Sequence, residues 1–364
     1  MSKKNIVISG SNIKSGGPLT IFNFFLLEFN NKSNDFNTIA FVNNKNLFPN
    51  YSNILFIELK WYKKFIPLKF LYEYIYYYYY SKNKNIDIWI SLSDCSPIVK
   101  SKVQVAYFHN AIPTHFFNLK EIWYSPLLYF QKFYSRLFYY ININKNDFLI
   151  VQQSWFREYV SKNYNFNINK IIVFPPNYFV PKSKPNLKNN THIFVYPTKA
   201  VFYKNNEILL KAFSQLNTDI HNKYTFYITL SGNENRYSKQ LYKKYRHLAN
   251  VIWTGQVSHE KMNKIYSESN TLLFMSKLES WGLPLTEAAS FGLNIVTSNL
   301  PFAHETLTNY EKAIFIDIND LNKLKEIIQS LVIKKQINFS ENYIIQKNEP
   351  FSETFDDCIN YFNI

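Results

Sequence analysis

Two glutamates, Glu279 and Glu287, lie in the stretch SKLESWGLPLTEAASFGLNIVTS at residues 276–298, with seven residues between them. Pro284 favours a helix start, because proline suits the first turn, and Gly292 is typical of the position just past a helix end. The stretch therefore predicts a loop carrying Glu279, followed by a helix with Glu287 in its first turn. The free N–H groups of such a helix start bind phosphate or carboxylate.

Glu287 has two interpretations on this spacing alone. A carboxylate in the first turn of a helix interacts favourably with the helix dipole, which contributes roughly 0.3–1 kcal/mol. The same carboxylate can accept hydrogen bonds from a ribose diol while the helix start holds the phosphates. The spacing does not separate the two, and the choice depends on what else the chain places nearby.

Lys199 and Lys204 follow the apolar run HIFVYP, which predicts a strand. Two cations at the carboxyl end of a strand can hold a diphosphate and stabilise it as a leaving group. Solvated loop lysines are the alternative, since lysine is abundant throughout this chain.

A second phosphate-cradling pattern stands near the N-terminus. Ile6–Ser9 predicts a strand, Gly16 and Gly17 lie in the loop after it, and Pro18 opens a helix. This order resembles a Gly-rich phosphate loop, but it lacks both the G-x-G-x-x-G spacing and the G-K-[ST] ending. A plain tight turn is the alternative.

His109 follows a predicted strand at Val103–Phe108, in the run YFHNAIP. Ligands on parallel sheets bind at the carboxyl ends of strands, so His109 is a candidate for contacting a substrate hydroxyl or a reacting sugar. A single histidine also commonly has a structural role.

Short apolar runs that alternate with helical segments predict an α/β protein with parallel sheets. Besides the strands already named, the runs lie at Thr38–Val42, Ile54–Glu58, Ile86–Leu92, Phe148–Gln152, Ile171–Phe174, Thr225–Leu230, Val251–Thr254, Thr271–Met275 and Ile295–Thr297. A chain of 364 residues favours two domains. The polar stretch PKSKPNLKNNT marks the boundary, giving domains at 1–180 and 192–345, a linker at 181–191, and a C-terminal helix at 346–364 that can pack back on the N-terminal domain.

Composition limits the partners and the compartment. The formal net charge of +15 and a sequence pI near 9.4 favour an anionic partner. Cys95 and Cys358 are far apart, which fits a reducing compartment and argues against a Cys-rich zinc site. No signal peptide and no apolar run of membrane-spanning length are present, so we expect a cytoplasmic protein.

Two segments mix lysine or arginine with aromatic residues at helical spacing, at Lys60–Lys84 and Asn118–Lys145. Such helices can lie on an anionic membrane surface, with aromatic side chains at headgroup level. They can instead pack their tyrosines on the sheet. Stacking on nucleic acid is the remaining alternative, although no nucleic-acid-binding module accompanies them.

The run from Asn250 to Glu305 resembles the donor domain of the retaining GT-B glycosyltransferases (glycosyl transferases group 1). That family uses nucleotide sugars and carries two glutamates spaced as Glu279 and Glu287 are. TKAVFYKN resembles its basic loop, and SGSNIKSGGP resembles its N-terminal Gly loop. The resemblance is close over much of residues 193–305 and loose over the first domain. It implies two Rossmann-like parallel-sheet domains facing across a cleft, with the acceptor bound by the first and the donor by the second.

The resemblance also implies roles for individual residues. Glu287 would hold the donor ribose, Glu279 would contact the donor sugar, and His109 would lie over the reacting centre from the acceptor side. Glu279, His109 and Lys204 would be the catalytic residues. The base would be bordered by Gln256 and Val257, and the phosphates would be met by the segment Gly282, Leu283, Pro284, Leu285 and Thr286, assisted by Gly16, Gly17, Lys199 and Lys204. Lys199 stands where the family more often has arginine, which replaces a bidentate fork by a point charge.

We therefore expect a retaining, metal-independent hexosyl- or deoxyhexosyltransferase without a cofactor. It would move a sugar from a nucleotide diphosphate sugar to a hydroxyl of a lipid-linked oligosaccharide, in bacterial O-antigen, lipopolysaccharide or capsule biosynthesis. The protein would be peripheral on the inner face of the cytoplasmic membrane and would not bind nucleic acid. The alternative is a non-catalytic, membrane-associated glycan or nucleotide binder with the same fold.

Overall fold

The computed structural model describes residues 3–59, 66–176, 191–335, 337–340 and 348–362. The chain divides into two compact units, one made of Met1–His115, Phe130–Tyr178 and Lys347–Ile364, the other of Phe116–Tyr129 and Phe179–Gln346. The sequence places residues 116–129 in the first domain, whereas their contacts group them with the second unit. The predicted linker at 181–191 lies outside the described residues, apart from Thr191.

The first unit is built on a seven-stranded parallel sheet in the order β3-β2-β1-β4-β5-β6-β7. Its strands are β1 (Lys4–Ser9), β2 (Phe36–Val42), β3 (Ile54–Glu58), β4 (Ile88–Ser91), β5 (Val103–Phe108), β6 (Phe148–Val151) and β7 (Ile171–Val173). Strands β2 and β3 lie on one side of β1, whereas β4 and the later strands lie on the other, so the strand order reverses between β1 and β4. Ligands of open α/β sheets bind at the carboxyl ends of the strands beside such a reversal.

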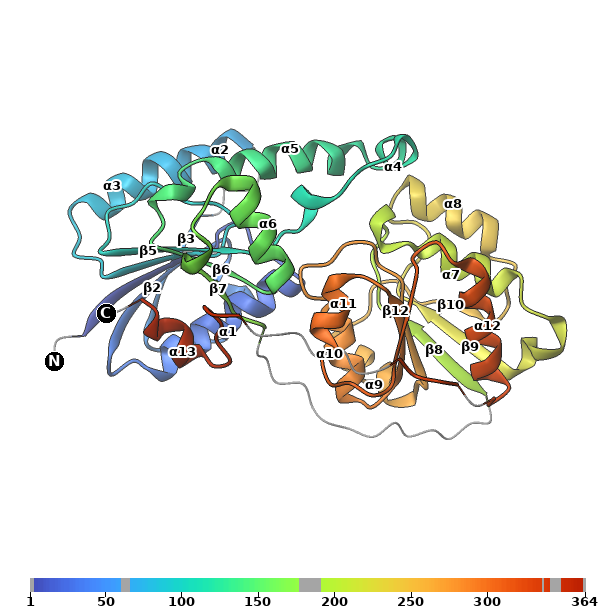
Figure 1. Ribbon diagram of the computed structural model, residues 1–364. Helices are drawn as coiled ribbons and strands as arrows, with labels where there is room; N and C mark the ends of the chain where they lie inside the picture. The colour runs from blue at the N-terminus through green and yellow to red at the C-terminus, as the bar shows by residue number, and fades with distance from the viewer. Residues whose placement is uncertain (1–2, 60–65, 177–190, 336, 341–347, 363–364) are drawn as a thin grey trace. The chain divides into compact units, whose positions relative to one another are not determined.

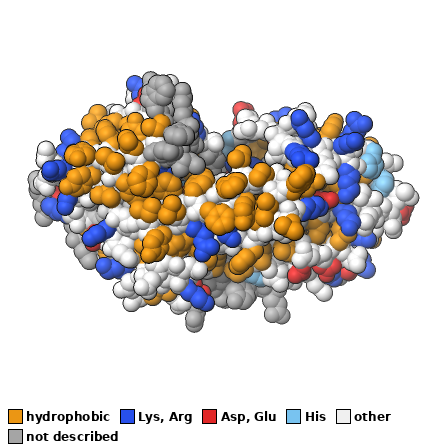
Figure 2. All heavy atoms as spheres, turned by 90° about the horizontal axis from the view of Figure 1, so that it is seen from above, with side chains coloured by type: hydrophobic (Ala, Val, Ile, Leu, Met, Phe, Trp, Pro, Cys, Tyr) orange, Lys and Arg blue, Asp and Glu red, His pale blue; other side chains and the backbone are white. Residues whose placement is uncertain are grey.

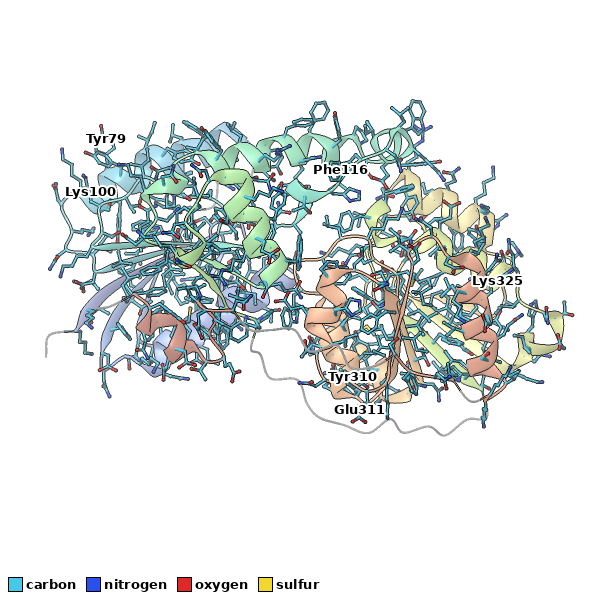
Figure 3. All side chains as sticks on the ribbon, viewed as in Figure 1. Tyr79, Lys100, Phe116, Tyr310, Glu311 and Lys325 are labelled. Carbon is cyan, nitrogen blue, oxygen red and sulfur yellow. The ribbon has the colours of Figure 1, made fainter. Side chains whose placement is uncertain are left out.

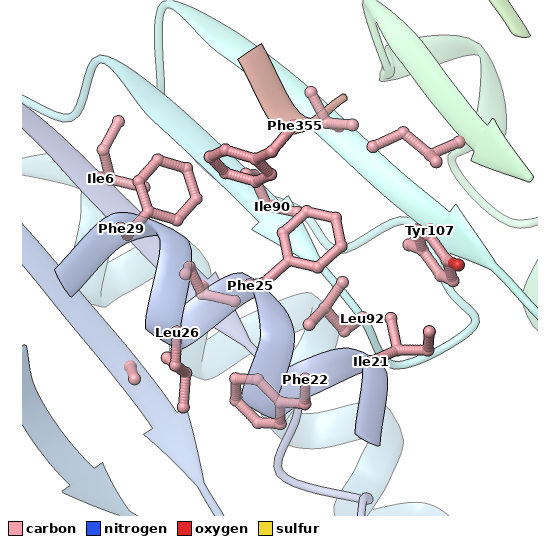
Figure 4. Packing of buried hydrophobic residues seen from close by; sticks show 14 of the residues in the cluster. Ile6, Ile21, Phe22, Phe25, Leu26, Phe29, Ile90, Leu92, Tyr107 and Phe355 are labelled. Atoms are coloured by element: carbon pink, nitrogen blue, oxygen red, sulfur yellow. The ribbon is translucent and has the colours of Figure 1, made fainter. Parts of the chain in front are cut away.

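Helices cover both faces of this sheet (Figure 1). They are α1 (Gly17–Asn31), α2 (Ile66–Leu71), α3 (Tyr77–Lys82), α6 (Ser154–Tyr164), α13 (Phe355–Asn360) and α5 (Pro126–Tyr140), whose first turn belongs to the second unit; a π-helical turn at Tyr72–Tyr76 joins α2 to α3. Helix α1 buries Phe22, Phe25 and Phe29, which recur at helical spacing, together with α13 residues such as Phe355 on one face of the sheet (Figure 4). Tyr77 and Trp89 pack on the opposite face.

The second unit holds a six-stranded parallel sheet in the order β10-β9-β8-β11-β12-β13. Its strands are β8 (His192–Tyr196), β9 (Tyr224–Ile228), β10 (Val251–Trp253), β11 (Thr271–Phe274), β12 (Asn294–Ser298) and β13 (Ala313–Ile316). Its helices are α4 (Leu119–Tyr124), α7 (Asn206–Ser214), α8 (Arg236–Tyr245), α9 (His259–Glu268), α10 (Leu283–Ser290), α11 (Pro301–Thr306) and α12 (Leu321–Val332). Here the strand order reverses between β8 and β11, because β9 and β10 lie on one side of β8 and the later strands on the other.

The predicted α/β class, with one parallel sheet in each half, is confirmed. The strands predicted at Ile54–Glu58 and Val103–Phe108 have those bounds in the structure, whereas β13 was not among the predicted strands. In the part of the chain that the structure describes, no helix combines the length and apolar character that crossing a bilayer requires.

Candidate functional site

Lys204 and Glu279 form an ion pair at the reversal of the second sheet. β8 and β11 are hydrogen-bonded neighbours, so the loops that follow them leave the same edge side by side. The Lys204 ammonium contacts Glu279 Oε1, and the two side chains are 13% and 14% exposed. The ammonium also lies 5.4 Å from the centre of the Phe274 ring at the end of β11. Two of the predicted catalytic residues are thus brought together in a largely buried position.

The loop carrying Lys204 is held by hydrogen bonds at several points. The hydroxyl of the buried Tyr196 donates to the carbonyl oxygen of Lys204. Asn205 adopts a left-handed conformation (φ 55°), and its side chain donates to the Ile318 carbonyl at 3.0 Å. The Lys277 N–H donates to the Tyr203 carbonyl at 2.7 Å, which ties the loop after β8 to the loop after β11. The ammonium is therefore positioned before any ligand binds.

Gly282 is the residue immediately before α10. It adopts a left-handed conformation (φ 89°) that residues with a side chain rarely adopt. The helix starts at Leu283, which makes Glu287 its fifth residue, with no acidic residue in the first turn. The prediction that Glu287 lies in the first turn is therefore wrong, because the helix starts one residue earlier than predicted and Pro284 occupies its second position rather than its first. The helix-dipole interpretation of Glu287 weakens accordingly, since that effect falls off within the first turn.

Glu287 is instead a partly buried carboxyl held by a neighbouring helix. Its Oε2 accepts a hydrogen bond of 2.8 Å from the hydroxyl of Tyr266 on α9, whose side chain is fully buried. Burial raises the pKa of Glu287 above its ordinary value, against a smaller lowering by the Tyr266 hydrogen bond. A carboxylate accepts about four hydrogen bonds, so Tyr266 orients the group and leaves capacity for a ligand.

The remaining predicted residues of the second unit are more exposed. The Lys199 side chain is exposed, whereas its carbonyl accepts from Asn206 Nδ2 at 3.1 Å. Gln256 is exposed and Val257 partly so, in the loop that follows β10.

The start of α10 is partly occupied by its own contacts. Pro284 has no N–H, the Leu285 N–H donates to the Gly282 carbonyl at 2.8 Å, and the Trp281 indole donates to the Thr286 hydroxyl at 2.9 Å.

Two predicted sites belong to the first unit. Gly16 has φ 70° and precedes α1, and its carbonyl accepts from the Leu19 N–H at 2.9 Å, so the loop makes a tight turn there. His109 follows β5, and its Nε2 lies 3.1 Å from Oδ2 of Asp94. Among the described residues, no group of three or more His, Cys, Asp and Glu side chains is arranged to hold a metal ion.

Tyr266, Tyr196 and Asp94 were not predicted. Tyrosine occurs 29 times, so single tyrosines carry no signal in this sequence. Asp94 follows β4 in SLSDCSP, and only the adjacency of β4 and β5 brings it to His109.

Comparison with known proteins gives one family match and two curated relatives. Residues 181–348 match the family described as glycosyl transferases group 1. An uncharacterized 41.2 kDa protein in the cps region of Klebsiella pneumoniae is 29% identical over 84 residues, which are 23% of this chain and 24% of that protein. The O-antigen chain mannosyltransferase RfbU of Salmonella typhimurium is 21% identical over 231 residues, and the match covers 61% of each chain. The chain thus spans less than two thirds of the length of either relative.

Solved structures similar to this one share the fold at low sequence identity. The lipopolysaccharide outer core galactosyltransferase WaaB, in its apo form, has a TM-score of 0.60 at 13% identity, covering 91% of this chain and 90% of that one. Anabaena HepE in complex with UDP and glucose has a TM-score of 0.60 at 12% identity, covering 90% of each chain. The two parallel-sheet units are those of the GT-B fold, and residues 181–348, in the second half of the chain, are similar to the glycosyl transferases group 1 family.

Proposed function

We propose that this protein is a retaining glycosyltransferase that takes a sugar from a nucleoside diphosphate sugar. The observation that carries the proposal is the Lys204–Glu279 pair at the sheet reversal of the second unit, with the partly buried Glu287 on the helix that follows. The three parts of a nucleotide sugar, in their order along the molecule, are the sugar, the diphosphate and the ribose, and we assign them to Glu279, Lys204 and Glu287. A binding protein would not need Glu279 beside the phosphate-holding lysine.

The leaving diphosphate gathers negative charge as the bond to the sugar breaks. Lys204 has three N–H donors, so it can keep Glu279 and still donate to a phosphate oxygen. Lys199 and the start of α10 supply further positive potential. Glu279 then faces the sugar and Glu287 the ribose diol. We expect transfer without a metal or cofactor, so a chelator should leave the rate unchanged.

Retention is proposed through a front-face route in which the leaving phosphate helps to deprotonate the acceptor hydroxyl. The residue assigned to the acceptor side is His109. The nucleotide base is assigned to the loop of Gln256 and Val257, which the structure leaves accessible.

The test is a panel of UDP-, GDP- and dTDP-sugars. We expect one nucleotide class to raise the unfolding temperature of the full chain, and Glu287→Ala to abolish that shift. Donor hydrolysis, followed by NMR of the released sugar, should show the anomer of the donor before mutarotation. A shift without any hydrolysis or transfer would favour the non-catalytic binder, and an inverted product would contradict retention.

The acceptor is proposed to be a lipid-linked glycan of a bacterial surface polysaccharide, as the names of RfbU and WaaB suggest. An exposed apolar face supports a membrane-bound acceptor. On α5 it comprises Leu127, Phe130, Phe133, Leu137 and Tyr140, and on the α2–α3 segment Phe70, Leu71, Ile75 and Tyr79. Figure 2 shows hydrophobic side chains gathered on this side with Lys and Arg among them, and Figure 3 shows Tyr79 projecting outward. Aromatic and basic residues together favour an anionic bilayer surface.

Flotation with vesicles tests this second part. The protein should float with vesicles containing an anionic lipid at low salt, and the double variant Leu71→Ser/Leu137→Ser should remain below. Ile333→Ser is the matched control, because Ile333 is 53% exposed but follows α12 in the second unit and belongs to neither helical segment. Equal flotation of all three proteins would contradict the proposed surface.

A further inference from the structure

Asp94 is a carboxylate that accepts several hydrogen bonds and lies beside the predicted catalytic residue His109. It follows β4 in a left-handed conformation with φ 54°, which few residues other than glycine, asparagine and aspartate adopt. Its Oδ1 accepts from the backbone N–H groups of His109 at 2.7 Å and Asn110 at 3.1 Å. The Asp94 side chain is 13% exposed, so these bonds form largely away from water.

Tyr139 completes the surroundings of this carboxylate. Its ring is fully buried on α5 and stacks on Phe108, with the ring centres 4.0 Å apart. Its hydroxyl lies 3.0 Å from Oδ1 of Asp94 and 2.9 Å from the Asn110 carbonyl oxygen. Burial, with a smaller contribution from the charge of Asp94, raises the pKa of Tyr139, so this hydroxyl stays a donor at neutral pH.

The two nitrogens of His109 are used differently. Nε2 lies 3.1 Å from Oδ2 of Asp94, while Nδ1 is buried and has no hydrogen-bond partner among the described residues. A carboxylate can only accept, so in the neutral ring the proton resides on Nε2 and Nδ1 carries the lone pair. An unsatisfied buried acceptor is costly, so the ring stays in this arrangement only because its surroundings enforce it.

We propose that Asp94 is the positioning residue of His109: it fixes the imidazole orientation and keeps the proton on Nε2, so that Nδ1 is the unprotonated ring nitrogen. This inference rests on the proposed function for the role of His109 toward a sugar of the donor or acceptor. The pairing of Asp94 with His109 does not depend on that identity. Asp94 acts through His109 and need not touch substrate.

A purely structural role is the competing explanation, because the same carboxylate also fixes the turn after β5. The two explanations differ in what Asp94→Asn does to His109. An amide keeps the shape and can still accept from the backbone, but its NH₂ can turn toward the ring and donate to it. Loss of the orienting carboxylate therefore changes the tautomer, whereas loss of a turn contact changes only stability.

The experiment is ¹⁵N NMR of the histidine rings in the full chain, at about pH 8, where an unperturbed ring is neutral. The His109 signals are assigned by their loss in His109→Gln. We expect the Nε2–H tautomer in the wild-type protein and in Tyr139→Phe, and a mixture or the Nδ1–H tautomer in Asp94→Asn. An Nε2–H tautomer unchanged in a folded Asp94→Asn protein would overturn the proposal.

Kinetics on the same variants give the second readout. Asp94→Asn should lower kcat about 10- to 100-fold with little change in the KM of the nucleotide sugar, and adding it to His109→Gln should cost nothing more. Additive losses would assign Asp94 a separate role and contradict the proposal. If the wild-type protein turns over no sugar at all, the proposed function fails, while the tautomer measurement still decides whether Asp94 sets the state of His109.

Discussion

The Lys204–Glu279 pair predicts a strong energetic coupling that a double-mutant cycle can measure. Breaking a buried ion pair by removing one partner costs about 3–5 kcal/mol, because a buried charge is left without its partner. The small remaining exposure of 13% and 14% brings our expectation to about 2–3 kcal/mol for Lys204→Met or Glu279→Gln alone. The double variant leaves no charge behind, so we expect it to lose only about 1 kcal/mol. Independent single losses would add to about 4–6 kcal/mol, so the expected coupling is about 3–5 kcal/mol.

Urea unfolding of the four proteins measures this coupling. In a domain of this size, each single variant should also lower the unfolding temperature by about 5–10 °C, and the double variant by much less. All three variants should retain the native circular dichroism spectrum. Single variants as stable as the wild-type protein, or losses that simply add, would show that the pair is absent in solution.

Activity separates the structural role of the pair from its chemical role. The double variant should be nearly as stable as the wild-type protein and yet remain unable to transfer sugar, since the phosphate has lost its cation. We expect kcat/KM of Lys204→Met and of the double variant to fall about 100- to 1000-fold, as when a group that stabilises developing charge is removed. Near-normal turnover in a folded Lys204→Met protein would refute the phosphate-holding role.

Three further predictions follow from single residues. Burial raises the pKa of Glu287, so the contribution of this carboxyl to stability falls as pH rises from 4.5 through the raised pKa. At neutral pH, Glu287→Gln should therefore unfold at a higher urea concentration than the wild type. The same variant should lose donor binding in a thermal-shift assay. Burial, with repulsion from Lys334, lowers the pKa of His192 from 6.5 to about 4. The free energy of unfolding should therefore fall as pH drops from 6.5 towards 4, by about 2 kcal/mol at pH 5. His192→Gln should remove this loss in urea titrations. Gly282→Ala should cost about 1–2 kcal/mol, because its φ of 89° disfavours any side chain and the new Cβ would lie 3.1 Å from Leu285 Cδ1; unchanged unfolding would contradict the left-handed helix start.

The fold was predictable because each strand is a short apolar run between turn residues. Ile54–Glu58 and Val103–Phe108 show how sharply such runs define strand ends. β13 (Ala313–Ile316) was not predicted, although the turn residues Asp317, Asn319 and Asp320 follow it; a run of only four apolar residues is the shortest that indicates a strand. Helix starts were harder to predict: Pro284 is compatible with either of the first two helical positions, and an error of one residue moved Glu287 into the first turn.

The site was predictable only in its residue types. The two loops that carry Lys204 and Glu279 are distant in the sequence, and they meet because β11 pairs with β8 instead of with β10, the strand before it in the chain. Strand order is a property of the packed sheet and cannot be read from local spacing. Asp94 and His109 meet for the same reason, through the adjacency of β4 and β5.

The ion pair of Lys204 with Glu279 changes which cations should attract the donor diphosphate and which should stabilise it as it leaves. With its ammonium already opposite Glu279, Lys204 adds little net positive charge, and the exposed Lys199 and the start of α10 become the stronger attraction for an incoming diphosphate. Lys204 contributes most when the bond to the sugar breaks, because the added charge on the phosphate then competes with Glu279 for a cation that is already in place. Removing Lys199 should therefore weaken donor affinity more than kcat, whereas removing Lys204 should lower kcat more than affinity. Equal effects on both quantities from both lysines would show that the two cations act as one undivided patch.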